Sequence, residues 1–95
     1  MHNYKTTFVR PNTAVDFPAM PDSALLAHIT TAHTIPTKTV EVSQDTLVLT
    51  MTRTFASEEA AVAFSQDPLV VAWATAAAAH CAANGMEYSA TFEAV

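Results

Sequence analysis

Two hydrophobic periodicities divide the chain into strand-like and helix-like segments. Alternation of side-chain character, or clustering of β-branched residues, is typical of strands in four segments: 4–10, 37–43, 46–55 and 87–93. Pro11 ends the first segment, and the spacing at Gln44-Asp45 between the second and third predicts a β-hairpin. The chain therefore has four predicted strands, and the middle two are neighbours.

Helix start and stop signals lie between these strands. Asp22-Ser23 offers candidate caps for a first helix, which must end by Pro36. Ser57 predicts the cap of a second helix. Asp67-Pro68 is typical of a cap followed by the first residue of a new helix, so we expect the second helical stretch to be broken there. Gly85 supplies a left-handed stop.

The order of these elements is strand, helix, strand, strand, helix, strand, in a single domain over residues 1–95. Right-handed crossovers fold this order into an α+β, ferredoxin-like βαββαβ domain, with an antiparallel four-stranded sheet and the helices on one face. Residues 11–21 contain three prolines, and we expect them to form an ordered loop or lid.

The alternation also assigns each strand residue to one of two sheet faces. The face toward the helices carries large apolar side chains: Phe8, Val40, Val42, Leu47, Leu49, Met51, Tyr88 and Phe92. The opposite face is rich in threonine: Thr7, Val9, Thr39, Glu41, Val48, Thr50, Thr52, Thr54, Ser89 and Thr91. A solvated sheet face normally carries more Lys and Glu, so we favour a homodimer, formed through this face or a strand edge, over simple exposure to water.

Composition and charge support self-association and exclude nucleic-acid binding. Apolar residues make up 51% of the chain and charged residues 14%, against about 25% charged in an average domain. The net charge is −5, and the four basic residues are scattered, so the chain lacks a basic surface that could neutralise phosphates. The partner we expect is a second copy of the chain.

The sequence also bears on location and cofactors. Residues 68–86 are uncharged but rich in alanine, and they contain His80 and Asn84, so we expect a helix covered by protein rather than a membrane span. A single cysteine, Cys81, and an N-terminus without an apolar signal segment predict a cytoplasmic protein. No Cys-x-x-Cys pair and no Gly-rich phosphate loop occurs, so we expect no metal and no other cofactor.

The segment from Thr54 to Pro68, TFASEEAAVAFSQDP, resembles the dimeric α+β barrel superfamily, which includes the antibiotic-biosynthesis-monooxygenase-like domains. These proteins often leave the third strand through an aromatic residue, a Ser and an Ala-rich short helix, followed by an Asp/Ser-Pro break and a longer helix. The resemblance implies a homodimer. Haem-degrading members follow the aromatic of the short helix, here Phe64, with a ligating His, but that position falls at Trp73 or Ala74 in this chain, which argues against haem. Other members are cofactor-independent oxygenases or non-catalytic proteins, so the resemblance leaves the chemistry open.

Histidines and large side chains on apolar faces are the candidates for a ligand pocket. His33 lies within the apolar stripe of the first helix, with His28 at its edge, and Trp73 and His80 share one face of the later helix. A buried imidazole needs a hydrogen-bond partner, and we favour satisfied core or interface histidines over functional ones. Arg53 shares the inward strand phase, where it would suit a small anion, but we favour an arginine that extends to solvent. The candidates for a pocket between sheet and helices are His33, Met51, Arg53, Trp73, His80 and Tyr88.

Two functional hypotheses follow, and neither assigns a catalytic residue. The first is a small-molecule-binding domain, with a cofactor-independent oxygenase or isomerase as its catalytic form. A cavity smaller than a few water molecules would remove its basis. The second is a non-catalytic homo-oligomeric module. We favour association over catalysis.

Overall fold

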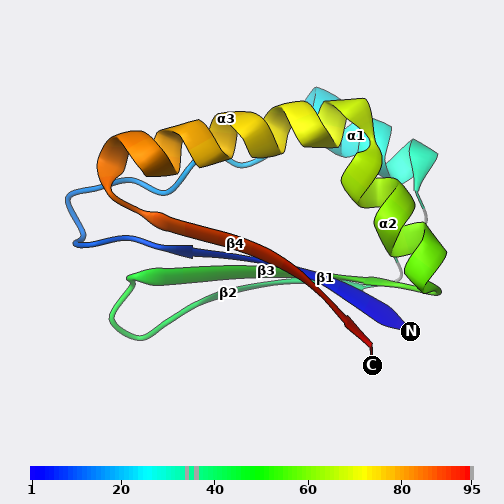
Figure 1. Ribbon diagram of the computed structural model, residues 1–95, viewed down its shortest axis with the longest axis horizontal. Helices are drawn as coiled ribbons and strands as arrows, with labels where there is room; N and C mark the ends of the chain where they lie inside the picture. Colours follow the sequence, from blue (N-terminus) through cyan, green and yellow to red (C-terminus); the bar gives the residue numbers. More distant parts are fainter. Residues whose placement is uncertain (34, 36, 95) are drawn as a thin grey trace.

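The computed structural model describes residues 1–33, 35 and 37–94 of the chain, and it shows an open sheet with all helices packed on one face (Figure 1). The elements follow in the order β1 (His2–Val9), α1 (Ser23–Ala32), β2 (Thr37–Val42), β3 (Val48–Phe55), α2 (Glu58–Gln66), α3 (Pro68–Asn84) and β4 (Glu87–Ala94). The strand order is β2-β3-β1-β4, and every pairing is antiparallel. The predicted α+β class is confirmed, and the arrangement is compatible with a ferredoxin-like fold.

The first two helices begin at the cap residues expected from the sequence. At the start of α1, the Asp22 carboxylate accepts a hydrogen bond from the Leu25 amide at 2.8 Å. At the start of α2, the Ser57 hydroxyl accepts one from the Ala60 amide at 3.2 Å. Each cap satisfies one of the amides that a helix leaves without an internal partner at its first turn.

The break between α2 and α3 occurs at Asp67. Its amide ends α2 by donating to the Phe64 carbonyl at 3.2 Å, and its carboxylate caps α3 by accepting from the Leu69 amide at 3.0 Å. Pro68 follows in the first turn, where a missing N–H costs nothing. At the other end of α3, Gly85 adopts a φ of 68°, the left-handed conformation that ends the helix. The predicted break and stop are both confirmed.

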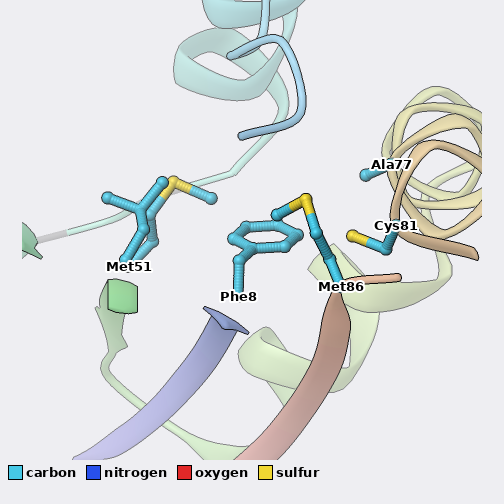
Figure 2. Packing of buried hydrophobic residues seen from close by; sticks show 6 residues of the cluster. Phe8, Met51, Ala77, Cys81 and Met86 are labelled. Atoms are coloured by element: carbon cyan, nitrogen blue, oxygen red, sulfur yellow. The ribbon is translucent and has the colours of Figure 1, made fainter. Parts of the chain in front are cut away.

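The core divides into two hydrophobic clusters along the sheet. The first lies beneath the C-terminal half of α3 and contains Phe8, Leu49, Met51, Ala77, Cys81 and Met86. Figure 2 shows the Phe8 ring between the Met51 and Met86 side chains, with Cys81 beside Met86. The second cluster packs α1 and α2 against the sheet and contains Ile29, Phe55, Ala61, Phe64 and Val70. Because α3 contributes to both clusters, it ties the two ends of the sheet together.

The uncharged helix α3 is covered by protein on one side, as expected. Its side chains Val70, Ala77 and Cys81 are buried. Among the described residues, no helix combines the length and the hydropathy that a membrane crossing requires.

Three side chains of the inward set lie on the helix side of the sheet but are not buried there. Val40 and Val42 are 51% and 54% exposed, because β2 is an edge strand and α2 and α3 contact β1, β3 and β4 instead. Phe92, on the opposite edge strand, is 48% exposed and packs its ring against Tyr4 at a centroid distance of 5.1 Å. The expectation that these three side chains meet the helices is wrong, since both edges of the sheet extend beyond the helix layer.

The second face of the sheet carries the predicted hydroxyl-rich surface. The register arranges its residues in cross-strand rows, and the two central rows are Thr39-Thr52-Lys5-Thr91 and Glu41-Thr50-Thr7-Ser89. All three helices lie on the other side of the sheet (Figure 1), so no described element covers this surface. These two rows, together with the neighbouring Val9 and Val48, are called the outer face below.

Candidate functional site

A small cavity lies between the sheet and the helices. Its sheet side is lined by Tyr4 and Thr6 of β1, Arg53 of β3 and Tyr88 of β4. Its helix side is apolar and is formed by Pro21, Leu25, Ile29, Phe64, Val70, Trp73 and Ala74. The volume open to the centre of a water molecule is about 10 Å³, close to the minimum for one water. The cavity is therefore smaller than the few water molecules that the small-molecule hypothesis requires of a pocket at this place.

Arg53 is the unusual residue of this cavity. It is only 4% exposed, so the expectation that it extends to solvent is wrong. The reason is that Phe64 of α2 covers it, with the guanidinium carbon 5.2 Å from the ring centroid. Among the described residues, its side chain forms no ion pair and no hydrogen bond. Burial lowers the pKa of Arg53, while the neighbouring Tyr4 acts in the opposite direction.

Two tyrosine hydroxyls belong to the same cavity. Burial raises the pKa of Tyr4, and the Arg53 charge and hydrogen bonding with Tyr88 offset this only in part. Burial also raises the pKa of Tyr88, and Tyr4 and Cys81 raise it further. Both phenols therefore stay protonated near neutral pH and can donate hydrogen bonds.

The two histidines near the end of α1 meet a single carboxylate. The Nε2 atoms of His28 and His33 lie 2.7 and 2.8 Å from Asp67 Oδ2. Hydrogen bonds from His33, and then from His28, hold the pKa of Asp67 well below its usual range. His33 also contacts the Phe64 ring edge-on, at a centroid distance of 5.4 Å. Its imidazole is therefore satisfied in the way that the sequence favoured.

Trp73 and His80 hold the loop 11–21 against α3. Trp73 Nε1 donates a hydrogen bond to the Ala19 carbonyl at 3.0 Å, and His80 Nε2 lies 2.7 Å from the Asp16 carbonyl. An open groove of about 430 Å³ lies beside these two side chains, bordered also by Pro18, Ala19, Met20, Asp22, Leu25, Ala76 and Ala77. It is a surface groove between the loop and α3, not a pocket between sheet and helices.

The six candidate pocket residues are distributed over several places in the structure. Arg53, Trp73 and Tyr88 line the cavity, and Trp73 also borders the groove together with His80. Met51 is 1% exposed within the first core cluster. The sixth candidate, His33, forms a hydrogen bond with the Asp67 carboxylate. The structure thus brings three of the six together, and their contact with a ligand stays a prediction.

Three residues that were not among the candidate site residues from the sequence contribute to these sites. Tyr4 and Thr6 share the inward phase of Phe8, so the strand alternation could have placed them beside Arg53. Asp67 was expected only as a helix cap. Asp67 is separated from His28 by 39 residues and from His33 by 34 residues in the sequence, and no local signal in the sequence specifies contacts over such distances.

The described residues offer hydrogen-bond donors and positive charge rather than a nucleophile or a metal site. Cys81 is 2% exposed, and burial raises its pKa, which makes the thiol a weak nucleophile. Within the described part of the chain, no group of three or more His, Cys, Asp or Glu side chains is arranged to hold a metal ion. What the cavity can do chemically is stabilise negative charge at Arg53.

Comparisons with models of known protein families, with curated proteins and with solved structures find no match to this chain. The resemblance of residues 54–68 to the dimeric α+β barrel superfamily therefore stays a prediction from the sequence.

Proposed function

We propose that the chain functions as a homodimer that associates through the outer face of its sheet. The supporting observation is that this face is open and consists mainly of short hydroxyl side chains, with Lys5 and Glu41 as the charged residues of its two central rows. Short side chains present a flat surface, which a second sheet can approach to about 10 Å. The barrel implied by the sequence resemblance is one such arrangement.

The outer face is large enough for a reversible dimer. Strands spaced about 4.8 Å apart, with about 3.3 Å per residue, give the four-stranded sheet a projected area of roughly 500 Å². Two copies would bury about 1,000 Å² in total, which is the lower limit for a specific interface. We therefore expect monomer and dimer to exchange rather than a permanent complex.

The charge distribution on this face favours a two-fold arrangement. Lys5 lies in a central row between Thr52 and Thr91, whereas Glu41 lies on the β2 edge and Glu87 on the β4 edge. A two-fold arrangement in which the two sheets cross at nearly a right angle can bring the central ammonium group of one copy toward an acidic edge of the other. Added salt should therefore weaken the dimer.

Analytical ultracentrifugation over the micromolar range tests this proposal. We expect the wild-type chain to associate, and we expect Thr52→Lys to weaken association by about tenfold or more, because it places a second cation beside Lys5. Thr75→Lys, at an exposed position of α3, is the matched control and should leave association unchanged. A wild-type monomer at these concentrations, or equal weakening by both substitutions, would contradict the proposal.

A second candidate function is the binding of a small apolar or aromatic molecule, and the groove beside Trp73 and His80 favours it. Its volume of about 430 Å³ lies within the range of about 300–1,000 Å³ typical of ligand sites. Trp73 is the only tryptophan, so its fluorescence reports occupancy of the groove. We expect the Trp73 fluorescence to change saturably on titration with toluene. This change should be lost in Ala76→Glu, which lies within the groove, and kept in Ala78→Glu, which lies outside it. A linear, unsaturable response would remove this candidate.

A further inference from the structure

Positive charge is concentrated at one point of an otherwise acidic chain. The net charge is −5, yet Arg53 is buried on β3 directly opposite Lys38 of β2. Burial lowers the pKa of Lys38, and the Arg53 charge lowers it further. No Asp or Glu of the described residues forms an ion pair with either cation. A buried charge without a partner is costly, so an anion that reached it would be held firmly.

The guanidinium group is buried but not sealed. Throughout the described part of the chain, every fully enclosed side-chain nitrogen or oxygen has a hydrogen-bond partner. Arg53 has no such partner, so its nitrogen atoms keep contact with open space, and the space that Arg53 lines is the cavity. Its donors are therefore available to a group that occupies the cavity.

The other polar groups around the cavity suit the same kind of occupant. Tyr4 and Tyr88 carry protonated hydroxyls, and Thr6, a residue that is 2% exposed, lies on the same side. Arg53, Thr6 and one hydroxyl of the hydrogen-bonded Tyr4–Tyr88 pair can donate hydrogen bonds, and among the described residues no carboxylate lines the cavity to compete for them. The helix side is apolar, with Trp73 and Leu25 among its residues. Donors on one side and apolar groups on the other match an anionic head with a short hydrocarbon tail.

We propose that this cavity binds a small monocarboxylate, whose head accepts hydrogen bonds from Arg53 and from one hydroxyl of the Tyr4–Tyr88 pair and whose tail lies toward Trp73. The cavity volume of about 10 Å³ is enough for about one water molecule, so formate is the carboxylate nearest to its size, and acetate enters only by displacing apolar side chains of the helices. The site lies on the helix side of the sheet, away from the outer face, so it does not depend on the dimer.

Thermal unfolding in the presence of sodium acetate tests the proposal. Sodium chloride at equal ionic strength and acetamide, the neutral analogue of acetate, are the reference solutes. We expect a saturable rise of the unfolding midpoint with acetate and not with either reference, because only a ligand that prefers the native state stabilises it. Arg53→Met keeps an unbranched apolar stem without the charge and should abolish the response. Lys38→Met, which removes the exposed cation opposite, should leave the response within about twofold.

Arg53→Met should fold at least as stably as the wild type, because it removes an unpaired buried charge. Should it fail to fold, Tyr88→Phe is the second variant, and loss of one hydroxyl should weaken the acetate response several-fold. Equal effects of acetate and chloride, an undiminished response in Arg53→Met, or no saturable effect at all would overturn the proposal, and the cavity would then hold water alone. A monomeric result in the ultracentrifuge would reject the dimer while leaving this site untouched.

Discussion

At the scale of single residues, the Asp67 carboxylate takes part in three hydrogen bonds. Oδ1 accepts from the Leu69 amide, and Oδ2 lies within 2.8 Å of both His28 Nε2 and His33 Nε2. The Asp67 side chain is 9% exposed and that of His33 is 13% exposed, so solvent screens their contact only weakly. Asp67 therefore caps α3 and fastens α1 to the junction of α2 and α3 at the same time.

We expect Asp67→Asn to lower the unfolding midpoint at neutral pH, because an uncharged amide cannot reproduce two charge-assisted hydrogen bonds. The native pKa of Asp67 is depressed below that of the unfolded chain, which is about 3.9. The carboxylate therefore stabilises the fold above about pH 4, and this contribution is lost as the pH falls from there toward the native pKa. Urea denaturation of both proteins at neutral and acidic pH measures the difference.

The matched control for this prediction is Asp16→Asn, which makes the same chemical change where only the backbone carbonyl is engaged. We expect the stability gap between wild type and Asp67→Asn to narrow toward acidic pH and the control to show no such gap. A gap that is independent of pH would show that Asp67 acts through packing rather than through its charge.

At the scale of elements, local chemistry is sufficient to place the helix ends and the strands. The helix ends depend on contacts within a few residues of the chain. Asp22 and Ser57 accept hydrogen bonds from amides in the first turn of their helices, and Gly85 adopts the left-handed conformation that ends α3. Strand phase is equally local, since a period of two is fixed once one residue is assigned. These parts of the fold could be predicted from the sequence for that reason.

Whether a strand residue is buried depends on which other elements pack over it, and local sequence does not determine this. The predictions about burial that were wrong have this cause. Val40 lies on the helix side of the sheet, as predicted, but it is exposed. The helix layer is too narrow to cover the edge strand β2. Arg53 also has the correct phase, and whether it reaches solvent depends on Phe64, which a different element places over it. The shared face of Trp73 and His80 could be read from their spacing, but their partners are carbonyl groups of a proline-rich loop, which no side-chain pattern reveals.

At the scale of the whole molecule, the sheet has one covered and one open face, and the loop 11–21 completes the covered side. Arg10, just beyond β1, connects this loop to the turn between β2 and β3. Its Nε donates to the Thr46 carbonyl at 2.8 Å and its Nη1 to the Val15 carbonyl at 3.1 Å. Its guanidinium carbon also lies 4.4 Å from the centroid of the Phe17 ring. One side chain therefore fastens the loop at the end opposite to its contacts with α3.

We expect Arg10→Met to loosen this loop while leaving the core folded. The substitution removes two hydrogen bonds and a cation–π contact, which together contribute about 1–3 kcal/mol. Two of the contact partners, Val15 and Phe17, pack against the first core cluster but are not among its buried members. Amide hydrogen exchange should accelerate over residues 13–17, whereas the amides of β1 and β3 keep their protection, since a loop can open without global unfolding. Lys5→Met, which removes the other cation of this strand region from the outer face, is the control and should not change exchange in the loop. If exchange instead accelerated uniformly across the sheet, Arg10 would be stabilising the whole domain, and the loop would not open as a separate unit.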